Sequence, residues 1–272
     1  MGYLTTEKTK ITVHTLMAMK REGEKITMLT AYDYTTACVI DQAGIDSILV
    51  GDSASNVMQG NDTTLPITLD DMIVYARGVA RGARRALVVC DMPFGTYQVS
   101  PEEAVRNVVR LVRETGVDAV KLEGGVEIAE TVRRIVDMGI PVMGHLGLTP
   151  QSINKFGGYG LRAKSEAEAA KLLADARALE EAGCFSIVLE KIPAALAKKV
   201  TELAHVPTIG IGAGVATDGQ VLVTTDMMGM TQGFKPKFLR QFAQVGEEMT
   251  KGVAAFCQAV KGCGYPNESE SY

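Results

Sequence analysis

The chain contains 272 residues, of which 46% are hydrophobic, and it carries a formal net charge of −4. This length and composition are sufficient for one large core, so we expect a single domain over residues 1–272. The acidic balance, without a cluster of lysines and arginines, argues against a nucleic-acid partner.

Continuous apolar runs that end at a glycine or a charged residue indicate eight strands buried on both faces. The strands are expected at residues 26–31, 46–53, 86–91, 117–125, 140–145, 184–190, 206–214 and 220–224. Between them, capping residues such as Thr68 and Ser100 begin segments of helical periodicity, and glycines such as Gly116 end them. The helices are expected at residues 12–22, 34–43, 69–84, 100–116, 126–138, 165–183, 194–204 and 236–261.

The remaining segments are two long loops and the two ends of the chain. Residues 54–67 and 146–162 have no regular period and are rich in glycine and polar residues, which is typical of functional loops in compact domains. We expect residues 1–25 to form an N-terminal helical plug and residues 264–272 to form a flexible tail.

The alternation of strands and helices favours a closed (β/α)8 barrel, that is, a TIM barrel of the α/β class. An open doubly wound sheet is the alternative, but it is more often shorter or split in two. No stretch approaches the roughly 20 apolar residues needed to span a bilayer, and the N-terminus lacks an apolar signal segment. We therefore expect a cytoplasmic protein with no membrane partner, and we read its scattered cysteines as reduced thiols.

Polar residues recur where the predicted strands end. In a parallel barrel these ends meet at one mouth, where catalytic groups lie. Polar residues are common at the ends of strands, so a single aspartate at a strand end would be weak support for an active site. Several charged residues that each follow an apolar run favour an active site. The residues are Asp52, Asp91, Lys121, Glu123, His145 and Glu190.

A set of carboxylates without clustered cysteines or histidines favours a hard divalent cation, so the pattern predicts Mg²⁺ and not zinc. Lys121 allows two interpretations. A desolvated lysine would be a Schiff-base nucleophile, whereas neighbouring carboxylates would keep it charged as a fixed cation. We favour the fixed cation.

Nine motifs closely resemble the ketopantoate hydroxymethyltransferase family, also named 3-methyl-2-oxobutanoate hydroxymethyltransferases, in family order and over nearly the whole chain. The motifs are TAYDY (30–34), VGDS (50–53), TLPIT (64–68), DMPF (91–94), VKLEGG (120–125), GHLGLTPQS (144–152), FGGYG (156–160), VLE (188–190) and GIGAG (210–214).

The resemblance implies a barrel of the phosphoenolpyruvate/pyruvate-binding type. It also implies transfer of a hydroxymethyl group from 5,10-methylenetetrahydrofolate to 3-methyl-2-oxobutanoate in pantothenate biosynthesis, through an enolate stabilised by Mg²⁺. A homo-oligomer, with paired pentamers as the expected form, belongs to the same implication.

The resemblance also implies roles for individual residues. Glu190 is the expected proton acceptor. The expected metal ligands are Asp52, Asp91 and Glu123, and the expected substrate-binding residues are Asp52, Ser53, Asp91, Lys121 and His145.

Two segments depart from the family pattern. Residues 54–58 replace a Leu-Gly-Met-like stretch, and Thr225-Asp226 replaces a His-Asp pair, but neither change touches the expected metal or base residues. Three other hypotheses remain. An isocitrate-lyase-like enzyme would share the barrel and Mg²⁺ but typically carries a reactive cysteine loop, which we do not find here. The others are a Schiff-base aldolase acting through Lys121 and a non-catalytic metabolite-binding barrel.

Overall fold

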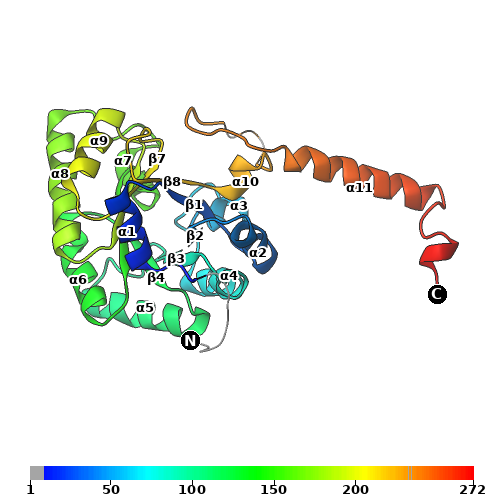
Figure 1. Cartoon of the computed structure of the whole chain (residues 1–272), viewed down its shortest axis with the longest axis horizontal. Helices are drawn as coiled ribbons and strands as arrows, with labels where there is room; N and C mark the ends of the chain where they lie inside the picture. Colours follow the sequence, from blue (N-terminus) through cyan, green and yellow to red (C-terminus); the bar gives the residue numbers. More distant parts are fainter. Residues whose placement is uncertain (1–8, 232, 234) are drawn as a thin grey trace. The chain divides into compact units, whose positions relative to one another are not determined.

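The computed structural model describes residues 9–231, 233 and 235–272. In this part of the chain, eight parallel strands pair in sequence order and the last pairs with the first, which closes a barrel (Figure 1). The strands are β1 Ile26–Thr30, β2 Ser47–Val50, β3 Leu87–Asp91, β4 Ala119–Glu123, β5 Val142–Gly147, β6 Ser186–Glu190, β7 Thr208–Ile211 and β8 Gly219–Leu222. The predicted (β/α)8 barrel is therefore confirmed.

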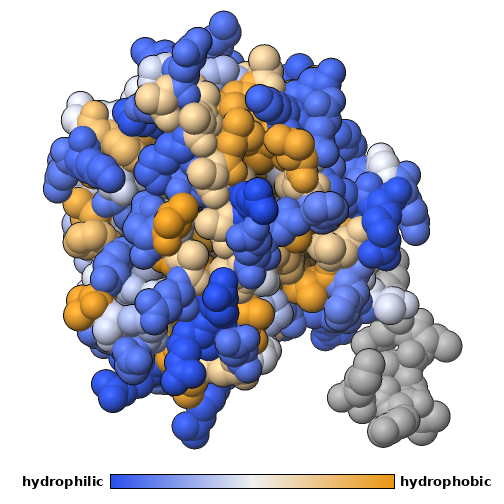
Figure 2. All heavy atoms as spheres, turned by 90° about the vertical axis from the view of Figure 1, so that its left-hand side faces the viewer, coloured by the Kyte–Doolittle hydropathy of each residue, from blue (hydrophilic) through white to orange (hydrophobic). Residues whose placement is uncertain are grey.

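Helices surround the barrel, and the two predicted capping residues cap their helices. Thr68 and Asp71 form a reciprocal capping box at α4 (Leu69–Gly82), and Ser100 accepts a hydrogen bond from the backbone of Glu103 at α5 (Pro101–Thr115). The helices up to residue 222 are α1 Val13–Glu22, α2 Tyr34–Gln42, α3 Ala54–Val57, α4 Leu69–Gly82, α5 Pro101–Thr115, η1 Val126–Ile128, α6 Ala129–Asp137, η2 Pro150–Ser152, α7 Ile153–Phe156, α8 Glu166–Glu181 and α9 Ala194–Leu203. Figure 2 shows the face that includes α8, where hydrophilic side chains cover much of the surface between smaller hydrophobic groups.

The alternation of side chains along each strand produces two cores. One set of residues, such as Val50, Cys90 and Leu122, packs between the strands and the helices. The other set, such as Val89 and Ala119, fills the barrel interior. This division decides which strand residues can reach the mouth of the barrel.

The N-terminal helix packs against the interior core. The side chains of Leu16 and Met19 are buried in the same cluster as Ile26 and Met28 of β1, near the amino ends of the strands. The predicted helix at residues 12–22 is thus confirmed. Residues 1–8 of the proposed plug lie outside the described residues.

Both predicted long loops contain short helical turns. Residues 54–57 form α3 directly after β2, and residues 150–156 form η2 and α7. The expectation that these segments lack regular structure was wrong in those places. The first turn forms because the backbone N–H groups of residues 57 and 58 bond to the carbonyls four residues earlier.

The chain divides into two compact units, residues 1–222 and residues 223–272. The second unit contains α10 Thr224–Met227, α11 Val245–Lys261 and η3 Glu268–Glu270. The predicted start of the last helix at residue 236 was wrong, because the N–H groups of Phe242 and Val245 bond to the carbonyls of Met227 and Met228 instead of continuing a helix. The grouping of both units into one domain stays a prediction. Among the described residues, no helix is long and apolar enough to cross a membrane.

Candidate active site

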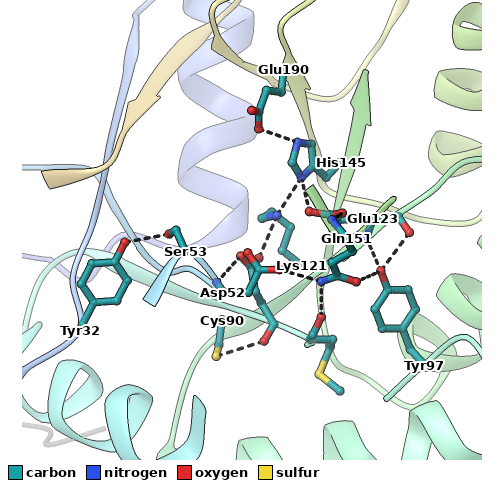
Figure 3. Close-up of polar contacts among 12 residues, drawn as sticks. Tyr32, Asp52, Ser53, Cys90, Tyr97, Lys121, Glu123, His145, Gln151 and Glu190 are labelled. Carbon is teal, nitrogen blue, oxygen red and sulfur yellow. Dashed lines mark hydrogen bonds and ion pairs between the residues drawn. The ribbon is translucent and has the colours of Figure 1, made fainter. Parts of the chain in front are cut away.

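The charged residues at the strand ends form one contact network inside the barrel mouth (Figure 3). Asp91, Lys121, Glu123 and His145 are each less than a tenth exposed. They point inward because they continue the alternation of the interior core: Val89 precedes Asp91 by two positions on β3, for example. Lys121 and Glu123, two positions apart on β4, therefore share the inward face of that strand.

Asp52 reaches the network from the turn that follows β2. Its backbone N–H donates to Oδ2 of Asp91 at 3.0 Å. Its own Oδ2 accepts a hydrogen bond from the side chain of Gln151 at 2.9 Å. Residues separated by 39 and 99 positions in the chain thereby become neighbours.

Lys121 is held between an acid and an imidazole. Its Nζ lies 2.9 Å from Oδ1 of Asp91 and donates to Nδ1 of His145 at 3.0 Å. Burial disfavours the charged ammonium, but the carboxylates of Asp91, Glu123 and Asp52 outweigh this effect and raise the pKa of Lys121. The side chain is therefore a cation at neutral pH, as the fixed-cation interpretation requires.

His145 connects Lys121 to Glu190. Its Nδ1 lies 3.0 Å from Nζ of Lys121 and 3.2 Å from Oε1 of Glu123. Its Nε2 lies 3.3 Å from Oε2 of Glu190, without a hydrogen bond in the described part of the chain. Burial, with the charge of Lys121, lowers the pKa of His145. Glu190 is the more exposed partner, with 15% of its side chain accessible against 4% for His145.

Burial of several carboxylates around one lysine is electrostatically costly. Burial raises the pKa of Asp52 well above its ordinary value, and the charges of Asp91 and Glu123 raise it further. Burial likewise raises the pKa of Glu123 to about 7, against the opposing effect of Lys121. Such perturbed groups are typical of functional sites.

The donor set fits a hard divalent cation. Asp52, Asp91 and Glu123 offer carboxylate oxygens, and Oδ1 of Asp91 and Oε1 of Glu123 are buried without a hydrogen bond, although Lys121 and His145 lie beside them. In the described part of the chain, there is no group of three or more His, Cys, Asp or Glu side chains that could bind a metal ion by itself. Mg²⁺ usually takes one or two carboxylates and keeps its remaining positions for water and substrate, so the two observations agree.

Gln151 and Tyr97 belong to the network but were missed as site residues by the sequence-based reasoning. Gln151 is buried on η2 and contacts Asp52, and the hydroxyl of Tyr97 donates to its Oε1 at 2.8 Å. Gln151 lies in the motif at residues 144–152, which was the available signal, whereas Tyr97 lies in none of the motifs.

Ser53 lies at the edge of this network. Its Oγ is 2.8 Å from the hydroxyl of Tyr32, which comes from the loop after β1 (Figure 3). Tyr32 is the central residue of the motif at residues 30–34, and it too had been given no role.

Two loops approach each other near the mouth. The hydroxyl of Tyr159 donates to the carbonyl of Asp62 at 3.4 Å, which joins the loop after β5 to the loop after β2. Burial raises the pKa of Tyr159, and the charges of Asp52 and Glu190 contribute, so its ring lies within electrostatic reach of both. A cavity of about 330 Å³ lies beside the network and is lined by Glu123, Gln151 and Phe94, among others.

The fold is a closed (β/α)8 barrel, and the buried cluster of charged residues at its strand ends is typical of an enzyme. In the same fold, phosphonopyruvate hydrolase, solved with oxalate and Mg²⁺, has a TM-score of 0.62 and 12% identity over 97% of this chain and 93% of its own. The enzyme 2,3-dimethylmalate lyase, a PEP mutase/isocitrate lyase superfamily member, has a TM-score of 0.57 and 18% identity, over 96% of this chain and 91% of its own. These likenesses show the fold.

Sequence comparison identifies the family within this class. Residues 10–268 match the family of ketopantoate hydroxymethyltransferases. The 3-methyl-2-oxobutanoate hydroxymethyltransferase of Phocaeicola vulgatus is 59% identical over 271 residues, which cover 100% of this chain and 99% of that protein. The enzyme of the same name from Parabacteroides distasonis is 60% identical over 263 residues, covering 97% and 96%. The chain therefore belongs to the ketopantoate hydroxymethyltransferase family and is a hydroxymethyltransferase.

Proposed function

We propose that the protein transfers a hydroxymethyl group from 5,10-methylenetetrahydrofolate to 3-methyl-2-oxobutanoate, giving 2-dehydropantoate and tetrahydrofolate in pantothenate biosynthesis. The observation that carries the proposal is the contact chain from Asp91 through Lys121 and His145 to Glu190. It sets a fixed cation at one end of a buried mouth and a more exposed carboxylate at the other. Removal of a proton next to a carbonyl needs both groups.

Charge balance supports a divalent cation in this site. Asp52, Asp91 and Glu123 bring three carboxylates beside the cation of Lys121, so the cluster has a net negative charge when all four groups are ionised. An anionic 2-oxo acid would be repelled by that charge. When bound by these carboxylates, Mg²⁺ would supply Lewis-acid stabilisation of the negative charge that develops on the substrate.

The chain's own residues divide the remaining tasks. Lys121 and the hydroxyl of Ser53 would bind the anionic substrate, with Asp52 and Asp91 beside it. Glu190 would accept the proton from carbon three, because it is the network's most accessible carboxylate and its Oε2 faces Nε2 of His145. His145 would hold that carboxylate in place.

The bonds balance with water as the third reactant. The C–H bond at carbon three breaks, the proton goes to Glu190, and the electron pair forms a C–C bond to the one-carbon unit of the folate. The two bonds from that carbon to the folate nitrogens break, and water supplies the oxygen of the new hydroxymethyl group. The two nitrogens take up the proton held by Glu190 and one proton of the water, which gives tetrahydrofolate.

The Schiff-base alternative is disfavoured by the environment of Lys121. A lysine nucleophile needs a lowered pKa, whereas the surrounding carboxylates raise the pKa of Lys121. We propose in addition that the enzyme acts in the cytoplasm as a homo-oligomer, with paired pentamers as the expected form.

The proposal is tested by assaying 2-dehydropantoate formation from the two substrates. We expect activity that EDTA abolishes and added Mg²⁺ restores, and no covalent trapping of substrate by borohydride. Activity that persists in EDTA, together with borohydride trapping on Lys121, would instead establish the aldolase mechanism.

A further inference from the structure

Gln151 uses its complete hydrogen-bonding capacity inside the site. Its Nε2 donates to Oδ2 of Asp52 and to the carbonyl of Met92, both at 2.9 Å. Its Oε1 accepts from the hydroxyl of Tyr97 at 2.8 Å and from Nε2 of Gln98 at 3.1 Å. Because the Asp52 carboxylate and the Met92 carbonyl only accept, these partners fix which end of the amide is nitrogen.

The backbone of Gln151 adds a second contact to the carboxylates. Its N–H donates to Oε2 of Glu123 at 2.9 Å. One residue of η2 thus holds an oxygen of Asp52 from the end of β2 and an oxygen of Glu123 from the end of β4. The second oxygen of Glu123, Oε1, is buried without a hydrogen bond and lies 3.2 Å from Nδ1 of His145.

Tyr97 orients this residue. Its hydroxyl accepts from the backbone N–H of Glu123 at 3.1 Å. The single hydroxyl proton has two acceptors within reach, Oε1 of Gln151 at 2.8 Å and the carbonyl of Glu123 at 3.1 Å, and the contact with Gln151 is the shorter. Buried polar groups are costly unless every partner is present, so this arrangement is a rigid support and not a chance contact.

We propose that Gln151 is a positioning residue that aligns Asp52 through its side chain and Glu123 through its backbone for a divalent cation, with Tyr97 fixing the direction of its amide. The inference rests on the proposed function only in placing Mg²⁺ among these carboxylates. Groups that orient metal ligands in this way typically contribute about 10- to 100-fold to metal affinity.

The test measures Mg²⁺ binding to the full-length, metal-depleted enzyme by calorimetry, without substrate. Gln151→Met keeps the side-chain length but removes all four side-chain hydrogen bonds, and we expect it to raise the Kd for Mg²⁺ by about 10- to 100-fold. Tyr97→Phe removes one hydroxyl and keeps the ring. We expect it to raise the Kd by roughly 3- to 10-fold, the equivalent of one neutral hydrogen bond.

Ser186→Ala is the matched control. Its hydroxyl is buried and donates to the carbonyl of Pro207 at 2.8 Å, away from the strand ends that carry the site. The Ser186→Ala variant loses a buried hydrogen bond but keeps every contact of the site carboxylates, so its Kd for Mg²⁺ should equal that of the wild type. High Mg²⁺ should restore most of the kcat of Gln151→Met but should not change that of Ser186→Ala.

The outcomes separate the two proposals. Wild-type protein with no saturable Mg²⁺ binding would contradict the metal-dependent function and this inference with it. Tight wild-type binding that is unchanged in Gln151→Met and Tyr97→Phe would contradict the positioning role alone. If Gln151→Met does not fold, the Kd of Tyr97→Phe decides the question.

Discussion

Nε2 of His145 lies 3.3 Å from Oε2 of Glu190, and the opposite ring nitrogen accepts a hydrogen bond from Lys121. The imidazole therefore lies between the fixed cation and the carboxylate that we propose as the base. Burial, together with the charge of Lys121, lowers the pKa of His145. Lys121 thus affects the protonation of the histidine as well as the charge near the substrate.

Replacing His145 by phenylalanine, which keeps a ring but has no N–H, should slow catalysis more than it weakens substrate binding. Without the imidazole N–H, Glu190 loses its orienting partner, and misplacement of a reacting group costs on the order of 100-fold in rate. We expect kcat to fall by roughly that factor with a smaller change in KM. His205→Phe is the control, because His205 is exposed and contacts Glu180 instead. Equal losses in both variants would refute the role of His145.

Replacing Lys121 by methionine should destabilise the protein strongly. The substitution leaves Asp91 and its neighbours buried without their cation, and breaking a buried pair costs about 3–5 kcal/mol. We expect the free energy of unfolding, measured in urea, to fall by about that amount. Lys198→Met is the control, since Lys198 forms only an exposed pair with Glu202 and should change stability by less than about 1 kcal/mol.

The raised pKa of Glu123, about 7 in the folded protein against an ordinary 4.5, predicts a pH dependence of stability without metal. The folded state binds more protons than the unfolded state across this window, so the free energy of unfolding should fall as pH rises from about 4.5 to about 7. Thermal unfolding of EDTA-treated protein between pH 5 and 8 measures this slope. Glu123→Gln should reduce it, and a slope identical to that of the wild type would show that Glu123 is not its source.

A substitution near the amino ends of the strands, opposite the site, should change the stability of the protein without changing substrate binding. Leu16 of α1 is fully buried against the interior core, and truncating such a leucine to alanine costs about 2–5 kcal/mol. We expect Leu16→Ala to lower the midpoint of urea unfolding. The KM for the 2-oxo acid should stay within about twofold of the wild-type value, because active sites in these barrels lie at the carboxyl ends of the strands. A large increase in KM at a temperature where the variant is folded would contradict this separation.

Much of the fold was predictable from the sequence because the barrel strands are buried on both faces. Each predicted strand range overlaps the observed strand, and the charged residues expected to meet at one mouth, such as Lys121 and Glu123, do lie together. The last helix was misjudged at its start, because residues 236–244 contain apolar residues at helical spacing but bond to the segment around Met227. The spacing of apolar residues in a sequence carries no information about such a tertiary contact.

The site was predictable only where residues end strands. Gln151 lies in a loop without a period, and its contact with Asp52 joins residues 99 positions apart. Its role depends on four simultaneous side-chain hydrogen bonds, which only the assembled barrel brings together. The roles given to the strand-end residues stay predictions until they are measured.

The central claim is that Glu190 removes the proton from carbon three of the 2-oxo acid. Its most direct test is the Mg²⁺-dependent exchange of deuterium at carbon three of 3-methyl-2-oxobutanoate, followed by NMR in the absence of the folate. The wild type should exchange, and Glu190→Gln should lose about 10²- to 10⁴-fold in rate while still binding Mg²⁺. Exchange by Glu190→Gln at the wild-type rate would contradict the assignment.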